Sequence, residues 1–261
     1  FGVVFDAPPR VDFGVAMTRL RRIRAQISHH DSYERFSKEL GVDVYQGRAR
    51  FVAKDAVDVG GQVLKFRKAV VATGASAAVP PIEGLKDVPY LTNANMFNLT
   101  ELPETVIVIG AGPIGLEMAQ SFARFGSKVI VFIRGKQLLP KEDVDAANVV
   151  HESLKDDGLE IHFESKYVKI THTKEGNKFN SPFHEITVDV EIKGQPQSYA
   201  CNTLLIATGR KPNVENVRLE LAGIEYDVKE GIKINKYCQT TNKNIFACGD
   251  VCTRFQFTHM A

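Results

Sequence analysis

The clearest chemical motif in the chain is Gly110-Ala111-Gly112-Pro113-Ile114-Gly115, which reads G-x-G-x-x-G. An apolar run at residues 106–109 precedes it and an amphipathic run at residues 114–125 follows, so the motif joins a predicted buried strand to a predicted helix. In that context the first glycine permits a tight turn, the second lets the backbone approach a pyrophosphate, and the third lets the helix pack against the strand. The free amides and the positive end of the helix attract the anion. We therefore expect a dinucleotide at Gly110, Gly112, Pro113, Ile114 and Gly115.

The residues after the next predicted strand, 128–133, distinguish the two nicotinamide dinucleotides. A domain that binds NAD usually offers Asp or Glu there to the ribose hydroxyls, whereas this strand is followed by Arg134-Gly135-Lys136. Cationic side chains form charge-assisted hydrogen bonds with a 2′-phosphate. We expect Arg134, helped by Lys136 or Lys141, to select NADPH. NAD stays open as the alternative, in which these cations are solvated loop residues.

Three shorter motifs each follow an apolar run. Ala-Thr-Gly occurs at residues 72–74, Ala-Thr-Gly-Arg at residues 207–210 with Pro212-Asn213 behind it, and Gly249-Asp250 ends a short predicted strand. An aspartate at the carboxyl end of a strand can accept hydrogen bonds from sugar or ribityl hydroxyls, although it is also a common helix cap. Alongside the first glycine motif, the occurrence of all these motifs in one chain is hard to produce by chance.

The elements around the motifs alternate between strand and helix. A helix is predicted from Met17, resuming over residues 32–40 and stopped by Gly41. Short alternating runs separated by glycines predict a small antiparallel ribbon at residues 42–45, 49–52, 56–59 and 63–66. An apolar strand at residues 68–74 follows. The Pro- and Gly-rich stretch from Pro80 to Pro89 then predicts a crossing connection without a packed element.

A second unit begins at Pro103 with the strand, glycine turn, helix and strand of a βαβ unit. One stripe of the helix, made of Ile114, Met118, Phe122 and Phe125, is expected to pack on the sheet. The alternation continues with a helix at residues 144–157 and a strand at residues 160–163. Alternating residues at 167–199 predict a three-stranded meander with turns at residues 175–177 and 193–194, and residues 203–209 form another apolar strand.

Composition excludes some classes of protein. The 261 residues are 44% hydrophobic, enough for two domains, and carry a formal net charge of +2, which gives no general attraction to nucleic acid or acidic membranes. No apolar run is long enough to span a bilayer. The four cysteines are too scattered for a disulfide scaffold and favour a reducing compartment. The first and last residues suggest a piece of a longer parent protein.

Taken together, the motifs resemble those of the pyridine nucleotide-disulfide oxidoreductase superfamily, in its mercuric reductase-like and dihydrolipoamide dehydrogenase-like branches. The resemblance covers nearly the whole chain, because the motifs occur in the family's order and spacing. Residues 31–36 and 256–260 are most similar to the mercuric-reductase-like branch. The resemblance implies an α/β, Rossmann-like flavoprotein fold with two dinucleotide-binding domains. Residues 1–98 would be a partial FAD-binding domain, 99–211 the inserted NAD(P)-binding domain, and 212–261 the returning segment of the FAD-binding domain.

The same resemblance implies roles for individual residues. Asp250 would bind the ribityl side of FAD, and Glu117 would lie beside the nicotinamide ring as the catalytic residue of this chain. Hydride would pass from NADPH to the flavin and on to a cysteine pair, which reduces a small-molecule, disulfide or mercuric-type acceptor in a homodimeric parent. Cofactor-binding residues are expected at the remaining motif positions, namely Thr73, Gly74, Thr208, Gly209, Arg210 and Gly249.

The chain departs from the family pattern at both ends. The opening FAD glycine motif, the C-x-x-x-x-C pair and the lysine after it belong upstream of Phe1, and the dimerisation domain belongs downstream, so the chain is expected to be catalytically incomplete. Cys248 and Cys252 have the wrong spacing for the redox pair and are expected to be buried or half-buried thiols. His259 could begin a following helix. The other histidines show no metal spacing with cysteines or acids.

Two alternatives stay open. The parent could be another flavoprotein reductase with two dinucleotide sites, of the NADH oxidase, quinone reductase or ferredoxin reductase type. The chain could instead be a truncated module that binds NADP(H) without catalysis.

Overall fold

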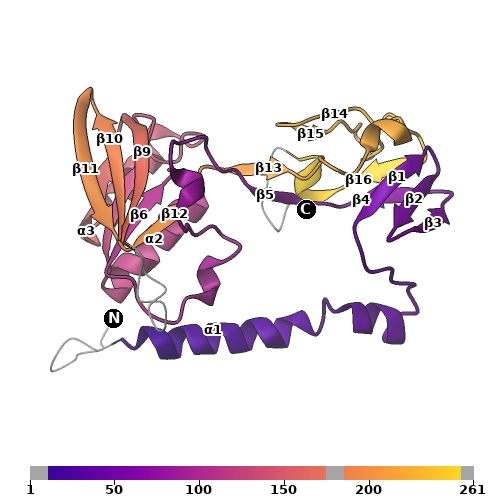
Figure 1. The fold of residues 1–261 in the computed structure, drawn as a ribbon, viewed down its shortest axis with the longest axis horizontal. Helices are drawn as coiled ribbons and strands as arrows, with labels where there is room; N and C mark the ends of the chain where they lie inside the picture. Colours follow the sequence, from indigo (N-terminus) through magenta and orange to yellow (C-terminus); the bar gives the residue numbers. More distant parts are fainter. Residues whose placement is uncertain (1–10, 175–184, 254–261) are drawn as a thin grey trace. The chain divides into compact units, whose positions relative to one another are not determined.

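A computed structural model describes residues 11–174 and 185–253, and the chain within it forms two compact units (Figure 1). The first unit contains Phe1–Ile27 and Val79–Gly209, and the second contains Ser28–Ala78 and Arg210–Ala261. The predicted turn at residues 175–177, His184 and the segment 256–260 with His259 lie outside the described residues. The predicted assignment of cofactors to domains stays a prediction, because a division into compact units assigns no ligand.

The centre of the first unit is a parallel sheet of four strands in the order β12-β6-β7-β8. The strands are β6 (Thr105–Ile109), β7 (Lys128–Phe132), β8 (Glu160–His162) and β12 (Thr203–Ile206). Strands β6, β7 and β12 are apolar along most of their length, because both faces of the sheet are covered. Alternate side chains serve the two faces: Val106 and Val108 belong to one buried cluster, and Ile107 and Ile109 belong to the other.

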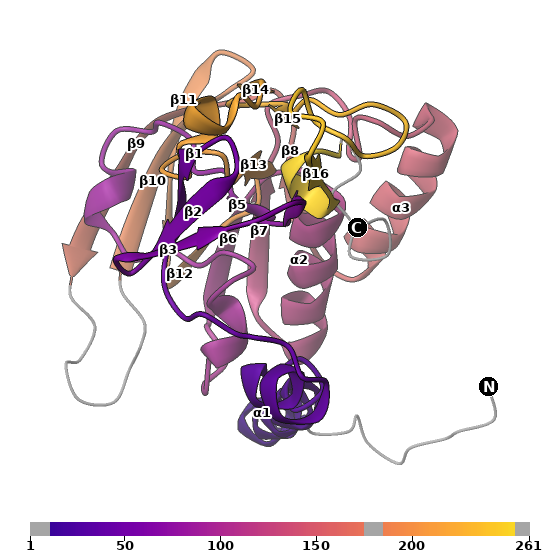
Figure 2. The ribbon, with the colours of Figure 1, turned by 90° about the vertical axis from the view of Figure 1, so that its right-hand side faces the viewer.

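Helices cover the first face (Figure 2). Leu116, Ala119 and Phe122 of α2 (Pro113–Phe125) and Leu154 of α3 (Val144–Asp156) pack against the valines of β6 and β7. Phe13 and Met17 of α1 (Phe13–Ser28) join the same cluster. Figure 2 shows α2 and α3 beside the strands of the sheet.

An antiparallel meander covers the second face, as the sequence predicts (Figure 1). It consists of β9 (Ser165–Lys174), β10 (Glu185–Ile192) and β11 (Gln195–Cys201). In β10 the burial alternates, so that Ile186, Val188, Val190 and Ile192 face the sheet. Two short 3₁₀ helices, η2 (Leu85–Asp87) and η3 (Met96–Asn98), complete this unit.

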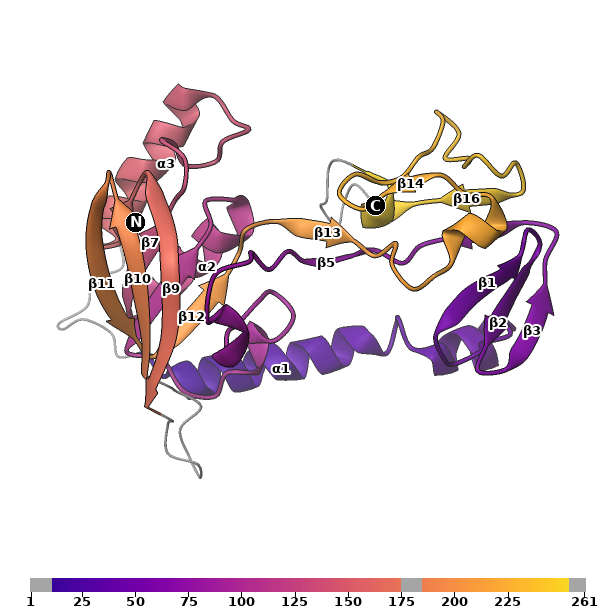
Figure 3. The same cartoon turned by 45° about the horizontal axis from the view of Figure 1, so that its top comes forward.

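The second unit is built from small sheets around one apolar cluster that includes Phe51, Val71, Leu219 and Ile245. Figure 3 shows β5 and β13 side by side as an antiparallel pair. The strands are β1 (Ala49–Ala53), β2 (Ala56–Val59), β3 (Gln62–Lys65), β4 (Ala69–Val71), β5 (Ala75–Ala77), β13 (Arg210–Pro212), β14 (Tyr226–Asp227), β15 (Gly231–Ile232) and β16 (Ile245–Ala247). The single turns are a π-helical one, η1 (Arg35–Glu39), and two 3₁₀ ones, η4 (Leu219–Ala222) and η5 (Gly249–Val251). Strands β1 to β3 confirm most of the predicted ribbon, and β4 pairs in parallel with β16.

Three predictions about local structure are wrong. Residues 42–45 are not a strand, because no described segment pairs with them and their apolar side chains are exposed. The Pro- and Gly-rich connection does contain a packed element: Leu85 is 1% exposed, and the amide of Ile170 on β9 bonds to the carbonyl of Glu83. Ile114 does not belong to the packed stripe of α2, since it is 37% exposed. The helix turns Gly115 and Leu116 towards the sheet instead.

The sheet buried on both faces predicts a large cost for truncation in β6. Ile107→Ala should lower the free energy of unfolding by about 2–5 kcal/mol, because Ile107 is fully buried and a cavity would remain. Val149→Ala on α3, at a side chain 72% exposed, is the control and should change it by less than about 0.5 kcal/mol. Urea unfolding followed by circular dichroism measures both. Equal effects of the two substitutions would contradict the described core.

Candidate functional site

The glycine turn after β6 is held by a close contact between backbones. Gly110 has φ +133°, and its amide donates to the carbonyl of Phe132 at 3.2 Å. A Cβ at Gly110 would overlap the carbonyl of Ala207, and one at Gly115 would lie 3.0 Å from the Cβ of Ala207. The fold itself therefore requires these two glycines, because the turn and the start of α2 press against the end of β12.

Gly112 is different, because the fold gives no reason for a glycine there. Its φ of −82° suits any residue, and no atom lies within 4 Å of the position that its Cβ would take. It is the N-cap of α2, no side chain caps the helix, and Pro113 follows at the first helical position. The amides at the start of a helix have no partner within the helix. An open space above uncapped amides suits an anion such as a pyrophosphate.

The loop after β7 folds back over this turn. The amide of Leu139 donates to the carbonyl of Ala111 at 3.0 Å, and Leu138 is buried. Arg134, at the start of the loop, is exposed and has no ion pair or hydrogen bond with another described residue. Its charge acts on Tyr167: burial raises the pKa of the Tyr167 hydroxyl, and the guanidinium of Arg134 opposes that shift.

Lys136 is not free in the way that Arg134 is. Its Nζ lies 3.7 Å from Oε1 of Glu164, which follows β8. Glu164 could not be predicted as the partner of Lys136, because nothing in the local sequence pattern links the two residues.

Glu117, the predicted catalytic residue, lies on the exposed side of α2. Its carbonyl accepts a hydrogen bond from Oγ of Ser121 at 2.7 Å. Within the described residues its carboxylate has no lysine partner, so its catalytic role stays a prediction.

In the second unit, Asn213 is hydrogen-bonded to the Ala-Thr-Gly region at residues 72–74. Its side-chain amide donates to the carbonyl of Thr73 at 2.8 Å, and its backbone amide donates to the carbonyl of Gly74 at 2.9 Å. Oγ1 of Thr73 donates in turn to the carbonyl of Asn213 at 2.8 Å. The sequence predicts Asn213 only as part of a motif. Its hydrogen bonds depend on the pairing of β5 with β13, which the local sequence does not reveal.

Arg210 and Asp250 form a largely buried ion pair. Nη2 of Arg210 lies 3.1 Å from Oδ2 of Asp250 and also donates to the carbonyl of Ala75 at 2.6 Å. The Nε of Arg210 is buried and has no acceptor among the described residues. Asp250 lies inside η5 and does not cap it, since Cys248 is the N-cap. The structure therefore brings together Arg210, Gly249 and Asp250.

Thr208 and Gly209 connect β12 to β13 at the boundary between the two units. Gly209 has φ +122°, a conformation that favours glycine. Their expected contact with a cofactor stays a prediction.

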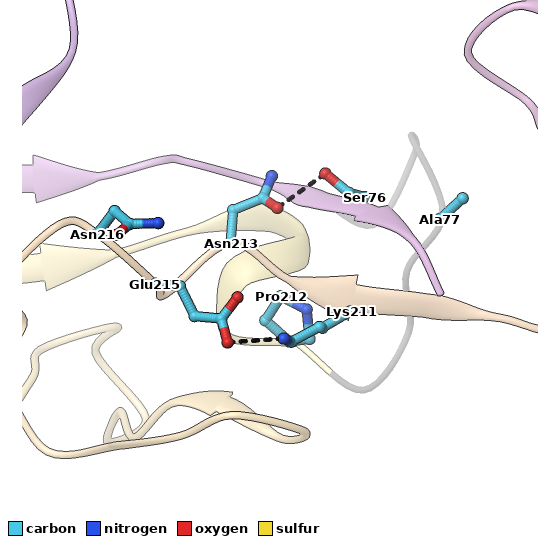
Figure 4. Close-up of a pocket in the computed structure, with 7 residues that line it drawn as sticks. All are labelled: Ser76, Ala77, Lys211, Pro212, Asn213, Glu215 and Asn216. Atoms are coloured by element: carbon cyan, nitrogen blue, oxygen red, sulfur yellow. Dashed lines mark hydrogen bonds and ion pairs between the residues drawn. The ribbon is translucent and has the colours of Figure 1, made fainter. Parts of the chain in front are cut away.

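A polar hollow of about 270 Å³ lies beside the motif residues of the second unit (Figure 4). Its charged side chains are paired, because Lys211 Nζ lies 2.8 Å from Glu215 Oε1, and Ser76 Oγ donates to Asn213 Oδ1 at 2.8 Å. These pairs leave the hollow without a free charged group to hold a ligand.

The four cysteines are free. Burial raises the pKa of Cys201 to about 12 and that of Cys252 to about 11, so both thiols are protonated and weakly nucleophilic at neutral pH. Cys252 is half-buried as expected, but Cys248 is exposed, because the chain leaves the buried strand β16 at that residue. In the described part of the chain, no cluster of three His, Cys, Asp or Glu residues could hold a metal ion.

Comparisons with known proteins place this geometry in context. A family model described as pyridine nucleotide-disulphide oxidoreductase matches residues 10–261. The mercuric reductase of Staphylococcus aureus is 35% identical over 231 residues, which cover 88% of this chain and 41% of that protein. The probable pyridine nucleotide-disulfide oxidoreductase RclA of Escherichia coli (strain K12) is 31% identical, covering 99% of this chain and 57% of that protein.

A further relative and a solved structure are also similar to this chain. The dihydrolipoyl dehydrogenase of Acholeplasma laidlawii is 30% identical, covering 100% of this chain and 74% of that protein. The structure of the HOCl-induced flavoprotein disulfide reductase RclA from Escherichia coli has a TM-score of 0.83 and 31% identity, covering 96% of this chain and 55% of that chain. The chain thus spans about half the length of several relatives that it matches. No helix in the described ranges is long and apolar enough to cross a membrane.

The two glycines of the turn should respond differently to alanine. Gly110→Ala should lower the free energy of unfolding by more than about 2 kcal/mol, because the new Cβ would overlap the carbonyl of Ala207 at positive φ. Gly112→Ala should lower it by less than about 1 kcal/mol, the cost of alanine at an N-cap. The same Gly112→Ala should weaken NADPH binding roughly tenfold, measured by calorimetry. Unchanged binding would show that the space above Gly112 is not used.

Proposed function

The chain belongs to the pyridine nucleotide-disulphide oxidoreductase family, and we propose that it supplies the NADPH site and part of the FAD site of a flavoprotein reductase. The expected α/β fold of a flavoprotein with two dinucleotide sites is confirmed by this membership and by the likeness to a flavoprotein disulfide reductase. The activity proposed for the whole protein is hydride transfer from NADPH to FAD. Electrons then pass to a disulfide or mercuric-type acceptor, as the names of the relatives suggest.

The single observation that carries the proposal is the open, uncapped start of α2 beside an unpaired arginine. Gly112 leaves room for a pyrophosphate where the fold needs no glycine. Ile114 is exposed at the same helix end, with Gly115 next to it. Arg134, on the loop that folds back onto Ala111, offers a guanidinium to the 2′-phosphate. The proposed NADPH site thus uses residues of the first unit alone.

The residues of the second unit fit part of a flavin site. The buried Nε–H of Arg210 lacks an acceptor among the described residues, as expected for a group that awaits a ligand oxygen. Arg210 holds the carboxylate of Asp250, which would accept hydrogen bonds from ribityl hydroxyls. Thr73, Gly74 and Gly249 would complete the backbone around it. When bound, FAD supplies the hydride-accepting ring.

Glu117 is proposed to orient the nicotinamide ring through its exposed carboxylate, with a lysine from outside this chain as its partner. The longer protein is proposed to be a homodimer acting on a small-molecule or disulfide substrate. In this proposal the FAD-binding domain comprises residues 1–98 and 212–261, on either side of the NADPH-binding domain at residues 99–211.

A second candidate, an NADP(H)-binding module without catalysis, has support of its own. Both buried clusters of the first unit lie within that unit, so its sheet is covered without the second. In the described part of the second unit the parallel pair β4–β16 forms a sheet of its own, and Val70 on β4 is 62% exposed. Parallel strands are normally buried on both faces. The described residues around the proposed flavin site are therefore less fully covered than those around the proposed NADPH site.

Reversal of the charge at Arg134 should change the dinucleotide preference. Arg134→Glu should weaken NADPH binding about tenfold or more, because it replaces a charge-assisted hydrogen bond with repulsion. NADH binding should hold or tighten, since an acidic residue suits the ribose hydroxyls. Calorimetric titration measures both. Arg22→Glu, at an exposed residue of α1, is the matched control and should leave both affinities within about twofold. Equal effects of the two variants on NADPH affinity would show that Arg134 does not contact the 2′-phosphate.

The isolated chain should bind FAD weakly. In the proposed fold the pyrophosphate of FAD is anchored by a glycine motif outside this chain, so purified material should be colourless or contain far less than one flavin per chain. Gel filtration followed by the visible spectrum tests this expectation. Stoichiometric flavin that survives the column would instead mean that the residues around Arg210 and Asp250 are a sufficient site.

A further inference from the structure

Glu164 occupies an unusual place beside the cationic loop. Its Oε1 lies 3.7 Å from Nζ of Lys136, one of the cations expected to help Arg134 meet the 2′-phosphate. Both side chains are accessible, with 85% of Lys136 and 40% of Glu164 exposed. A ligand that reaches Lys136 would therefore also meet the carboxylate.

The backbone holds Glu164 in that place by several hydrogen bonds. Its amide donates to the carbonyl of Gly135 at 3.0 Å, and the amide of the next residue, Ser165, donates to the carbonyl of Ile133 at 2.9 Å. Both acceptors flank Arg134. The turn that carries Glu164 is thus tied directly to the loop that carries the cations.

The conformation of Glu164 is costly for its residue type. Its φ is +53°, in the left-handed region that favours glycine and, among other residues, asparagine. An unfavourable backbone conformation at a residue other than glycine supports the hypothesis that its side chain has a use. Packing does not supply that use, because the carboxylate lies at the surface next to Lys136.

We propose that Glu164 is a specificity-determining residue that admits NADH to a site otherwise built for NADPH. This inference rests on the proposed dinucleotide site. The carboxylate holds Lys136 away from a 2′-phosphate and repels that phosphate itself. Towards NADH it acts in the opposite direction, because a carboxylate accepts hydrogen bonds from ribose hydroxyls. The acidic residue that is absent after β7 is thus supplied by the turn after β8.

The test is calorimetric titration of the chain with NADPH and with NADH. Glu164→Gln should tighten NADPH binding about two- to fivefold, as expected for the release of an exposed ion pair, and weaken NADH binding by a similar factor. The gain for NADPH should shrink at high salt, because exposed charges are screened. It should also fall in the Lys136→Met background, where there is no lysine to release.

Two further variants exclude trivial explanations. Glu164→Asn removes the charge with a residue that tolerates positive φ, so it repeats the test if glutamine disturbs the turn. Glu152→Gln on α3 breaks an ion pair of the same length, 3.7 Å to Lys155, and should change neither affinity by more than about twofold.

The outcomes separate the two proposals. If wild-type chain binds a dinucleotide but the ratio of NADPH to NADH affinity is the same in Glu164→Gln, Glu164→Asn and wild type, Glu164 does not set specificity. If folded wild-type chain binds neither dinucleotide, the proposed function fails, and this inference fails with it.

Discussion

The close passage of Gly110 beneath the carbonyl of Ala207 is the constraint on which the rest of the first unit depends. It sets β12 against β6 at the point where the chain turns into α2, in register with Ile206 opposite Ile109. Because no side chain can intervene, α2 starts directly above the sheet and Gly115 can lie against Ala207. The position of the helix end, and with it the direction of its free amides, follows from this one contact. Gly112 is then free to serve a ligand because Gly110 and Gly115 already satisfy the packing.

Much of this unit could be predicted from the sequence, because its signals are local. Continuous apolar runs predicted β6, β7 and β12, and alternating residues predicted the meander. The errors occurred where local signals oppose tertiary contacts. Leu85 lies among prolines and glycines yet is buried, because the connection around it is hydrogen-bonded to the neighbouring strand β9. Residues 42–45 have a strand pattern, but a strand needs a partner and no described segment supplies one.

The charged residues of the candidate site were likewise predictable only where the signal is local in the sequence. The glycine motif and Arg134 could be found because each lies next to the strand that positions it. The pairs Lys136–Glu164 and Arg210–Asp250 could not, since they join residues from different strands and turns. An ion pair depends on where two chain segments meet, and that is set by the pairing of β7 with β8 and by the turn that follows β16. Residue types therefore predict a kind of ligand, which stays a prediction, while the ion pairs around the motif residues are set by the fold.

The two units differ in how far their motifs are supported by surrounding structure. In the first, helices and meander cover a parallel sheet of four strands, so the glycine turn rests on a completed core. In the second, Asp250 follows a strand whose sheet consists, among the described residues, of β4 and β16. Parallel pairing is weaker per residue than antiparallel pairing and depends on burial of both faces. The ion pair with Arg210 and the hydrogen bonds of Asn213 compensate in part, because they fix the motif residues to one another. The described contacts therefore support the start of α2 within the first unit more fully than they support the residues around Asp250 in the second.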